Sequence, residues 1–292
     1  MAGLDLRPFS KFAEFVAVTR ESHIGSDLAG NLKPYVPLRA LKEYWTSANI
    51  SSVLRAFPKH LQINVGLIKE SYLRTFSTLV YADPKAVGEL EEFFIRRDLS
   101  DKRLPWSSRP SEWPDAPLFN KFFNDIAESQ WLFFPFCFRP GGLYNRLIND
   151  QCVLPIVFAQ ETIAQGTAAS VRAFDIHPDY NHLAVQRTFV FKIYHNQRHE
   201  SSYENECRAL RGLSSSPSPN VVKFYGSLQQ HGSYALILEY ADGGDLSQFF
   251  ETIPPPVTVE DVVMFWGSLF QVFAGLKRIH QQMHYEEEYF QG

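Results

Sequence analysis

The chain has 292 residues, of which 45% are hydrophobic and 21% charged, and its net charge at neutral pH is −4. This composition is typical of a globular protein with one large or two ordinary domains. The small negative charge, without any basic run, argues against nucleic acid or an anionic membrane as the main partner.

The cysteine pattern and the N-terminal segment indicate in which cellular compartment the protein is expected. Cys137, Cys152 and Cys207 are scattered and form no CxxC pair. This odd set supports neither a disulfide framework nor a zinc site, and we predict no metal site. The N-terminus lacks the apolar core of a signal peptide, and we find no apolar run long enough to span a membrane. We therefore expect an intracellular protein, cytoplasmic or nuclear, without a membrane partner.

The first half of the chain has the spacing of amphipathic helices. Residues 1–37 form a mixed segment with a short amphipathic piece near Phe9–Thr19, and residues 38–150 form a helical region. The apolar residues of this region that recur most clearly at helical spacing are Leu67, Ile68, Tyr72, Leu73, Phe76, Leu79 and Val80. We expect a packed helical module that is able to contact a protein partner.

Cap and turn signals divide this helical region. Ser51 or Ser52 is a candidate N-cap, and Asp83 followed by Pro84 predicts the start of another helix. The proline-rich stretch 104–117 predicts a loop, after which the helical pattern resumes. Several helices joined by loops are therefore expected.

Residues 151–240 have a different pattern, with alternating and β-branched segments. They predict a small antiparallel sheet with one helix at 202–213 and a strand pair around the turn His231-Gly232. Together with the first half, this order of elements predicts an α+β protein.

Residues 241–292 predict a hinge followed by helices. The stretch "GGDLSQFF" indicates a turn into a short helix. A long amphipathic helix follows, with Thr258 as its N-cap and Asp261 three residues later.

Five motifs in this order resemble a protein kinase domain that begins near residue 153. The first is "IAQGTAASV" at 163–171, which resembles the glycine-rich loop over the ATP phosphates, with Gly166 retained and alanine in place of the outer two glycines. The resemblance implies that Ile163 and Val171 contact the nucleotide. Taken alone, this stretch fits an ordinary hairpin equally well.

The second and third motifs supply a lysine and a glutamate. Lys192 in "VFKIY" resembles the kinase strand lysine that binds the α- and β-phosphates, and Val190 resembles the small residue beside the adenine. Glu206 resembles the glutamate that forms an ion pair with that lysine. Glu204 is the other candidate, but Glu206 shares a helix face with Leu210. From the residues alone, two other interpretations remain open: Lys192 could point into solvent, and Glu206 could belong to a solvated acidic helix face.

The fourth motif, "SYALILEYADGGDLSQFF", resembles the strand and hinge that hold the adenine. The resemblance places Leu238 at the gatekeeper position, assigns Glu239, Tyr240 and Ala241 to the hinge, and puts Asp245 at the ribose edge. The fifth motif, "LFQVFAGLKRIHQQ", resembles the long helix that leads to the catalytic loop.

The resemblance implies a kinase N-lobe at 151–240, the start of a truncated C-lobe at 241–292, and ATP as the ligand. In a complete serine/threonine kinase, ATP would carry magnesium. No HRD or DFG motif occurs in the sequence, so we expect the base and both magnesium ligands to be absent and phosphoryl transfer by this chain to fail. The alternative is a pseudokinase that acts as a non-catalytic interaction or scaffold protein.

The helical region and the C-terminal "FQG" also resemble a kinase group of filamentous fungi, in which a helical region precedes the kinase domain. An engineered protease-site tail is the other interpretation of "EEEYFQG".

Overall fold

The computed structural model describes residues 4–58, 60–113, 117–195, 199–214 and 218–289. The chain divides into two compact units, which we call the helical unit and the sheet unit. The described residues of the helical unit are those up to Phe138, with Ile148–Val157 and Ile176–Asn181. The sheet unit comprises Arg139–Leu147, Phe158–Asp175 and the residues from His182 onward.

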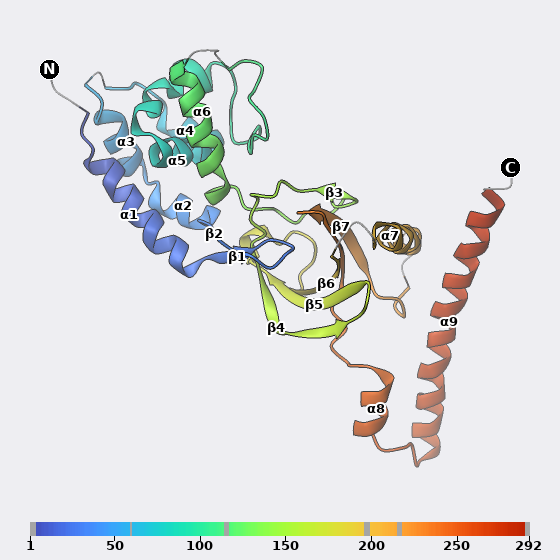
Figure 1. Cartoon of the computed structure of the whole chain (residues 1–292). Helices are drawn as coiled ribbons and strands as arrows, with labels where there is room; N and C mark the ends of the chain where they lie inside the picture. The colour runs from blue at the N-terminus through green and yellow to red at the C-terminus, as the bar shows by residue number, and fades with distance from the viewer. Residues whose placement is uncertain (1–3, 59, 114–116, 196–198, 215–217, 290–292) are drawn as a thin grey trace. The chain divides into compact units, whose positions relative to one another are not determined.

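Short helices build the helical unit (Figure 1). Its α-helices are α1 (Arg7–Ser22), α2 (Leu38–Tyr44), α3 (Ser47–Arg55), α4 (Val65–Ser71), α5 (Leu73–Ala82) and α6 (Pro117–Ser129). Its other elements are strands β1 (Ile24–Ser26) and β2 (Leu32–Pro34), the 3-10 helices η1 (Pro84–Glu89), η3 (Gln130–Leu132) and η4 (Pro178–Tyr180), and the π-helix η2 (Leu90–Ile95).

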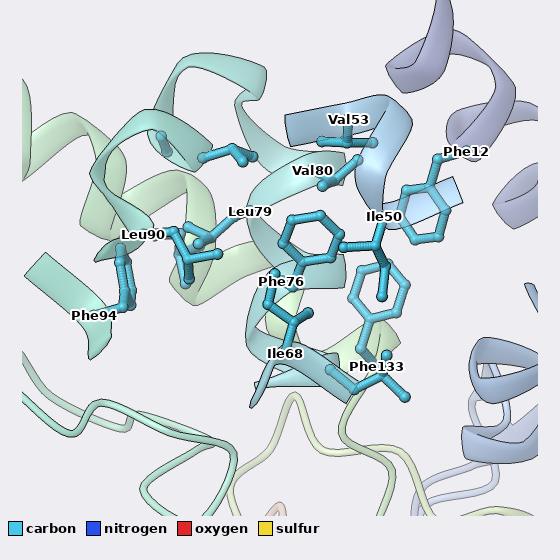
Figure 2. Close-up of a cluster of buried hydrophobic side chains, with 14 of the residues drawn as sticks. Phe12, Ile50, Val53, Ile68, Phe76, Leu79, Val80, Leu90, Phe94 and Phe133 are labelled. Carbon is cyan, nitrogen blue, oxygen red and sulfur yellow. The ribbon is translucent and has the colours of Figure 1, made fainter. Parts of the chain in front are cut away.

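An apolar core holds these helices together, and Figure 2 shows how their side chains converge. Phe12 of α1 and Phe76 of α5 are fully buried in it, and Trp45 packs against both rings. The Trp45 indole N–H donates to the Ser77 hydroxyl at 2.8 Å, so the polar atom of this buried ring is satisfied. The amphipathic spacing of the sequence therefore corresponds to one contiguous core.

One helix start differs from its predicted position, and a second has the predicted start but another helix type. Helix α3 begins at Ser47, because the Thr46 hydroxyl accepts from the Asn49 backbone N–H at 3.2 Å, and Ser51 and Ser52 lie inside the helix. The prediction of either serine as the N-cap is wrong. Asp83 does cap the next turn, by accepting from the Lys85 N–H, but the segment continues as 3-10 and π-helix instead of α-helix.

The sheet unit is built on a six-stranded sheet in the order β3-β7-β8-β6-β5-β4. Its strands are β3 (Arg146–Leu147), β4 (Ile156–Gln165), β5 (Ala169–Ile176), β6 (Thr188–Tyr194), β7 (Phe224–Gln230) and β8 (Ser233–Glu239). The pairs β5–β6, β6–β8 and β7–β8 are antiparallel, as expected, but β3 lies parallel to β7, so the sheet is mixed. Two exposed residues form β3, too few for a strand pattern to show in the sequence.

The β7–β8 turn follows the predicted order, as do the helices of the sheet unit, which Figure 1 labels α7 (Glu200–Ser214), α8 (Leu246–Thr252) and α9 (Val259–Tyr289). His231 and Gly232 both have positive φ, at 52° and 68°, which is the backbone of a tight hairpin turn. Thr258 caps α9 by accepting from the Asp261 N–H at 3.1 Å, which confirms the predicted cap. The α+β class is therefore confirmed.

Helix α9 corrects one expectation. Its residues Val259–Ile279 are long and apolar enough, by length and composition alone, to cross a membrane, although we expected no such stretch. The charged residues of this stretch lie near its two ends: Glu260 and Asp261 at one end, and Lys277 and Arg278 at the other. A single helix of this kind is weak evidence for a span, because the core helices of soluble proteins satisfy the same criteria.

Candidate functional site

Lys192 lies on the face of the sheet that packs against α7. Along β6 the side chains alternate, so Phe189, Phe191 and Ile193 are buried on one face, and Val190, Lys192 and Tyr194 lie on the other. The rings of Phe174 and Phe191 stack 3.9 Å apart on the first face. This aromatic packing fixes the register of β6 and so determines the direction in which Lys192 points.

Glu206 of α7 meets Lys192 across this face. The Lys192 Nζ donates to Glu206 Oε1 at 2.8 Å and to Oε2 at 2.6 Å. The two side chains are only partly shielded, with 30% and 33% of their surfaces exposed. Glu204, the other candidate, is exposed on the helix. Glu206 faces inward because it follows the buried Tyr203 by three residues.

Tyr194 completes this cluster and is not among the site residues predicted from the sequence. Its hydroxyl donates to Glu206 Oε2, and its ring lies 5.7 Å from the Lys192 Nζ. Burial raises the pKa of Tyr194, and the hydrogen bond to the Glu206 carboxylate raises it further. Since Tyr194 follows Lys192 by two residues in a strand, the shared face was a signal available in the sequence.

Three other predicted residues share the face of Lys192. The β5–β6 register pairs Val171 with Lys192, and the β6–β8 register pairs Val190 with Leu238. Directly opposed residues of antiparallel strands point to the same side, so these side chains form an apolar surface next to the ion pair. Leu238 packs against the cluster of buried side chains beneath α7.

The glycine-rich segment forms the β4–β5 hairpin, as its pattern predicts. The Gly166 N–H donates to the Ala169 carbonyl at 2.9 Å and closes the turn. A Cβ on Gly166 would lie 3.2 Å from that carbonyl oxygen, a tight contact, so glycine suits this turn for steric reasons. Ile163 lies at the end of β4 and is exposed.

Glu239, the first of the predicted hinge residues, has a structural role of its own. The Glu239 N–H donates to the Lys223 carbonyl at 2.8 Å, and its carboxylate accepts from the Lys223 N–H at 3.0 Å. Glu239 also lines a pocket of about 570 Å³ beside the last turns of α7. Tyr240 and Ala241 are exposed. Both the backbone N–H and the carboxylate of Glu239 are therefore engaged with the backbone of Lys223.

Asp245 is the N-cap of α8. Its side chain accepts from the Gln248 N–H at 2.9 Å, and the Gln248 side chain accepts from the Asp245 N–H at 3.2 Å. This reciprocal pair is a capping box, which stabilises the first turn of a helix. The kinase resemblance places Asp245 at the ribose edge and gives no indication of this capping role. A ribose contact is then a proposal that must compete with the cap for the same carboxylate.

In a comparison with protein families, residues 157–284 match the family described as "Protein tyrosine and serine/threonine kinase". Serine/threonine-protein kinase Nek5 of Mus musculus is 38% identical over 64 residues, which cover 22% of this chain and 10% of Nek5. Mitogen-activated protein kinase kinase 2 of Arabidopsis thaliana is 27% identical over 137 residues, covering 47% of this chain and 35% of that protein. The chain thus spans about a tenth to a third of the length of these relatives.

A solved structure gives a further, partial match. The crystal structure of Rad53 1–466 in complex with AMP-PNP is 23% identical, with a TM-score of 0.29, and the match covers 36% of this chain and 26% of that one. The family match spans the stretch that carries Lys192, Glu206 and the hinge motif. The C-terminal half of the chain accordingly contains a protein kinase domain whose distant relatives are serine/threonine kinases.

Proposed function

We propose that the sheet unit is the ATP-binding part of a serine/threonine protein kinase. The observation that carries this proposal is the ion pair between Lys192 and Glu206, with both lysine–carboxylate distances within 2.8 Å. A lysine directed by a helix glutamate is the arrangement that kinases use to hold the α- and β-phosphates of ATP.

We assign the other predicted site residues to either the adenine end or the phosphate end of ATP. Val171, Val190 and Leu238 supply the apolar surface for the adenine ring, and the backbone of Glu239–Ala241 supplies hydrogen bonds to its edge. At the other end, Gly166 brings the β4–β5 turn over the phosphates, and Lys192 neutralises part of their charge. In this assignment Glu206 acts through Lys192 by holding its ammonium group in place.

The residues present fit the nucleotide better than they fit a metal ion. Among the described residues, no group of three His, Cys, Asp or Glu side chains is placed to hold a metal. The 292 residues also contain no HRD or DFG motif, whose aspartates serve kinases as base and metal ligand. We therefore expect a protein of these residues to bind ATP without transferring its γ-phosphate.

A titration with ATP tests nucleotide binding. Isothermal calorimetry is expected to show binding to the wild-type protein and a loss of at least about tenfold in affinity for Lys192→Met, because a charge-assisted hydrogen bond contributes about 1.5–3 kcal/mol. Lys69→Met, in the exposed surface of α4, is the matched control and should bind normally. Equal affinities for wild type and Lys192→Met would contradict the proposal.

Phosphoryl transfer needs a separate assay. Incubation with radiolabelled ATP and a generic serine/threonine substrate is expected to label neither the substrate nor the protein itself. Transfer that disappears in Lys192→Met would show that these residues suffice for catalysis, against our expectation.

A non-catalytic scaffold is the second candidate, and the glycine-rich segment favours it. Ala164 and Ala169 stand where kinases have the outer glycines of this loop. A Cβ at those positions keeps the backbone N–H groups further from phosphates. Wild-type protein that fails to bind ATP in the calorimeter would favour this second function, in which the helical unit contacts a protein partner.

A further inference from the structure

A short segment that precedes the kinase-like strands lies against both the sheet and α7. We call residues Leu143–Leu147 the strap. All of its contacts described below lie within the sheet unit, and its last two residues form strand β3 beside β7 (Figure 1). The strap has no counterpart among the five kinase-like motifs of the sequence.

The strap is attached to the sheet at β7. The Ser227 N–H donates to the Leu143 carbonyl, and the Asn145 N–H donates to the Ser227 hydroxyl at 2.9 Å. Gly226, with φ at +150°, permits this approach, since a Cβ there would lie only 2.7 Å from the Leu143 carbonyl oxygen. The β-bulge between Phe224 and Gly226 therefore makes room for the strap.

The strap is also attached to one side of α7. The Tyr203 hydroxyl donates to Asn145 Oδ1 at 2.6 Å, and the Cys207 thiol lies 3.7 Å from the same oxygen. One turn further along, the Arg211 guanidinium lies over the Tyr144 ring at 4.2 Å. Residues spaced by four form one stripe along a helix, so the strap follows this stripe of α7.

Asn145 joins the two sets of contacts. Its Oδ1 accepts from Tyr203 on the helix and from Ser227 on the sheet, at 2.6 and 3.3 Å. Its backbone has φ of 47°, a left-handed conformation that asparagine adopts more readily than most residues. A single side chain thus links α7 to β7.

Glu206 lies on the neighbouring stripe of the same helix, between Tyr203 and Cys207 in sequence. Its bond to Lys192 requires that α7 keep its distance and rotation relative to the sheet. We propose that Asn145 is a positioning residue, and that the strap holds α7 where Glu206 reaches Lys192. Its effect on nucleotide affinity rests on the proposed function, whereas its effect on the ion pair does not.

The test measures how fast an amine-reactive acylating reagent labels Lys192, with peptide mass spectrometry as the readout and the exposed Lys69 as internal reference. A lysine ammonium held by a carboxylate is shielded from the reagent, so the rate reports the ion pair. Asn145→Gly removes the side chain and keeps the left-handed backbone. Asn145→Asp keeps both the backbone preference and the acceptor oxygen, and Glu206→Gln weakens the ion pair directly.

We expect labelling of Lys192 to rise about tenfold in Asn145→Gly, because a lost hydrogen bond shifts an equilibrium by about that factor. Glu206→Gln should give a similar rise, and Asn145→Asp should label like wild type. A general loss of folding would raise labelling in both Asn145 variants, so the rescue by aspartate is specific to the acceptor oxygen.

Three results would overturn the proposal. In the first, Asn145→Gly labels at the wild-type rate while Glu206→Gln labels faster. In the second, Asn145→Asp labels as fast as Asn145→Gly. In the third, Glu206→Gln labels like wild type, which would mean that the strap has no ion pair to maintain in solution.

Calorimetric titration of the same variants with ATP separates this proposal from the proposed function. We expect Asn145→Gly to bind several-fold more weakly than wild type and Asn145→Asp to bind normally. Wild-type protein that does not bind ATP would contradict the proposed function alone, because the labelling rates would still decide the role of Asn145.

Discussion

Glu206 has two donors on the sheet, the Lys192 ammonium and the Tyr194 hydroxyl, and they approach from neighbouring positions of one strand face. Two hydrogen-bond donors fix the orientation of a carboxylate as well as its distance from each donor. Tyr194 therefore restricts the rotamer in which Glu206 faces Lys192. This second donor distinguishes the site from a simple lysine–glutamate pair.

Replacing Tyr194 by Phe removes this donor and retains the ring. We expect the free energy of unfolding to fall by about 1 kcal/mol, the usual contribution of one hydrogen bond, and ATP affinity to fall modestly. Urea unfolding and calorimetry measure the two effects. Tyr225→Phe is the matched control, because Tyr225 packs against Phe189 on the opposite face of the sheet. Equal effects of the two substitutions would contradict the role of Tyr194.

At the scale of elements, local patterns predicted the strands and helices of the sheet unit well. The alternation of "TFVFKIY" predicted a strand, which is β6, and the His231-Gly232 turn predicted the β7–β8 hairpin, whereas the direction of Lys192 stayed open until the packing was known. What the sequence could not show depends on residues distant along the chain. The strap contacts of Asn145 reach 58 residues to Tyr203 and 82 to Ser227, and no local pattern reports such pairs.

Helix α5 illustrates the same limit in the helical unit. Its N-terminus is capped from a distant loop, where the Asp101 carboxylate accepts from the N–H groups of Arg74 and Thr75 at 3.0 and 2.8 Å. The predicted continuous helical pattern over 67–80 breaks at Tyr72, between α4 and α5. A carboxylate at a helix N-terminus stabilises the helix through hydrogen bonds and the helix dipole.

Substitutions of Asp101 test this cap. Asp101→Ala is expected to lower the free energy of unfolding by about 1 kcal/mol, the usual effect of losing an N-cap. Urea unfolding followed by circular dichroism measures it. Asp125→Ala is a control for the loss of a carboxylate, because Asp125 forms only a partly exposed i,i+4 pair with Lys121. An equally small effect of both substitutions would show that the cap contributes little.

The cap also predicts a pH dependence. Burial raises the pKa of Asp101 above its ordinary value of 3.8, although hydrogen bonds from Arg74 and Thr75 oppose this effect. The native state then keeps a proton that the unfolded chain has already lost, so this group reduces stability as the pH rises from 3.8 through the folded pKa. Asp101→Asn removes the titration. The free energy of unfolding of Asp101→Asn, relative to that of wild type, should increase with pH in that window. A difference that stays constant with pH would contradict the raised pKa of Asp101.

At the scale of the whole molecule, the two units differ in how completely they bury their apolar side chains. The helical unit encloses a large aromatic core, whereas α9 in the sheet unit exposes many of its apolar residues. The exposed apolar side chains of α9 are Val259, Val263, Met264, Trp266, Phe270, Val272, Phe273, Leu276 and Ile279. A contiguous apolar surface of this kind is unusual in a soluble monomer.

A hydrophobic dye tests this surface. Protein with serine in place of Phe270 and Phe273 is expected to bind less of the dye than wild type, because the two rings are more than half exposed. Fluorescence titration with the dye measures the change. Leu147→Ser, an exposed apolar residue outside α9, is the matched control. Wild-type protein that remains monomeric and binds no dye would contradict the exposure of this helix in solution.

The most direct test of the central claim is protection of Lys192 by nucleotide. Labelling by an amine-reactive reagent is followed at Lys192 and Lys69 without ligand, with ATP and with adenosine. If Lys192 holds the phosphates, ATP should slow its labelling by about tenfold, while adenosine, which lacks phosphates, should protect it little, and Lys69 should not respond. Equal labelling of Lys192 with and without saturating ATP would contradict the account.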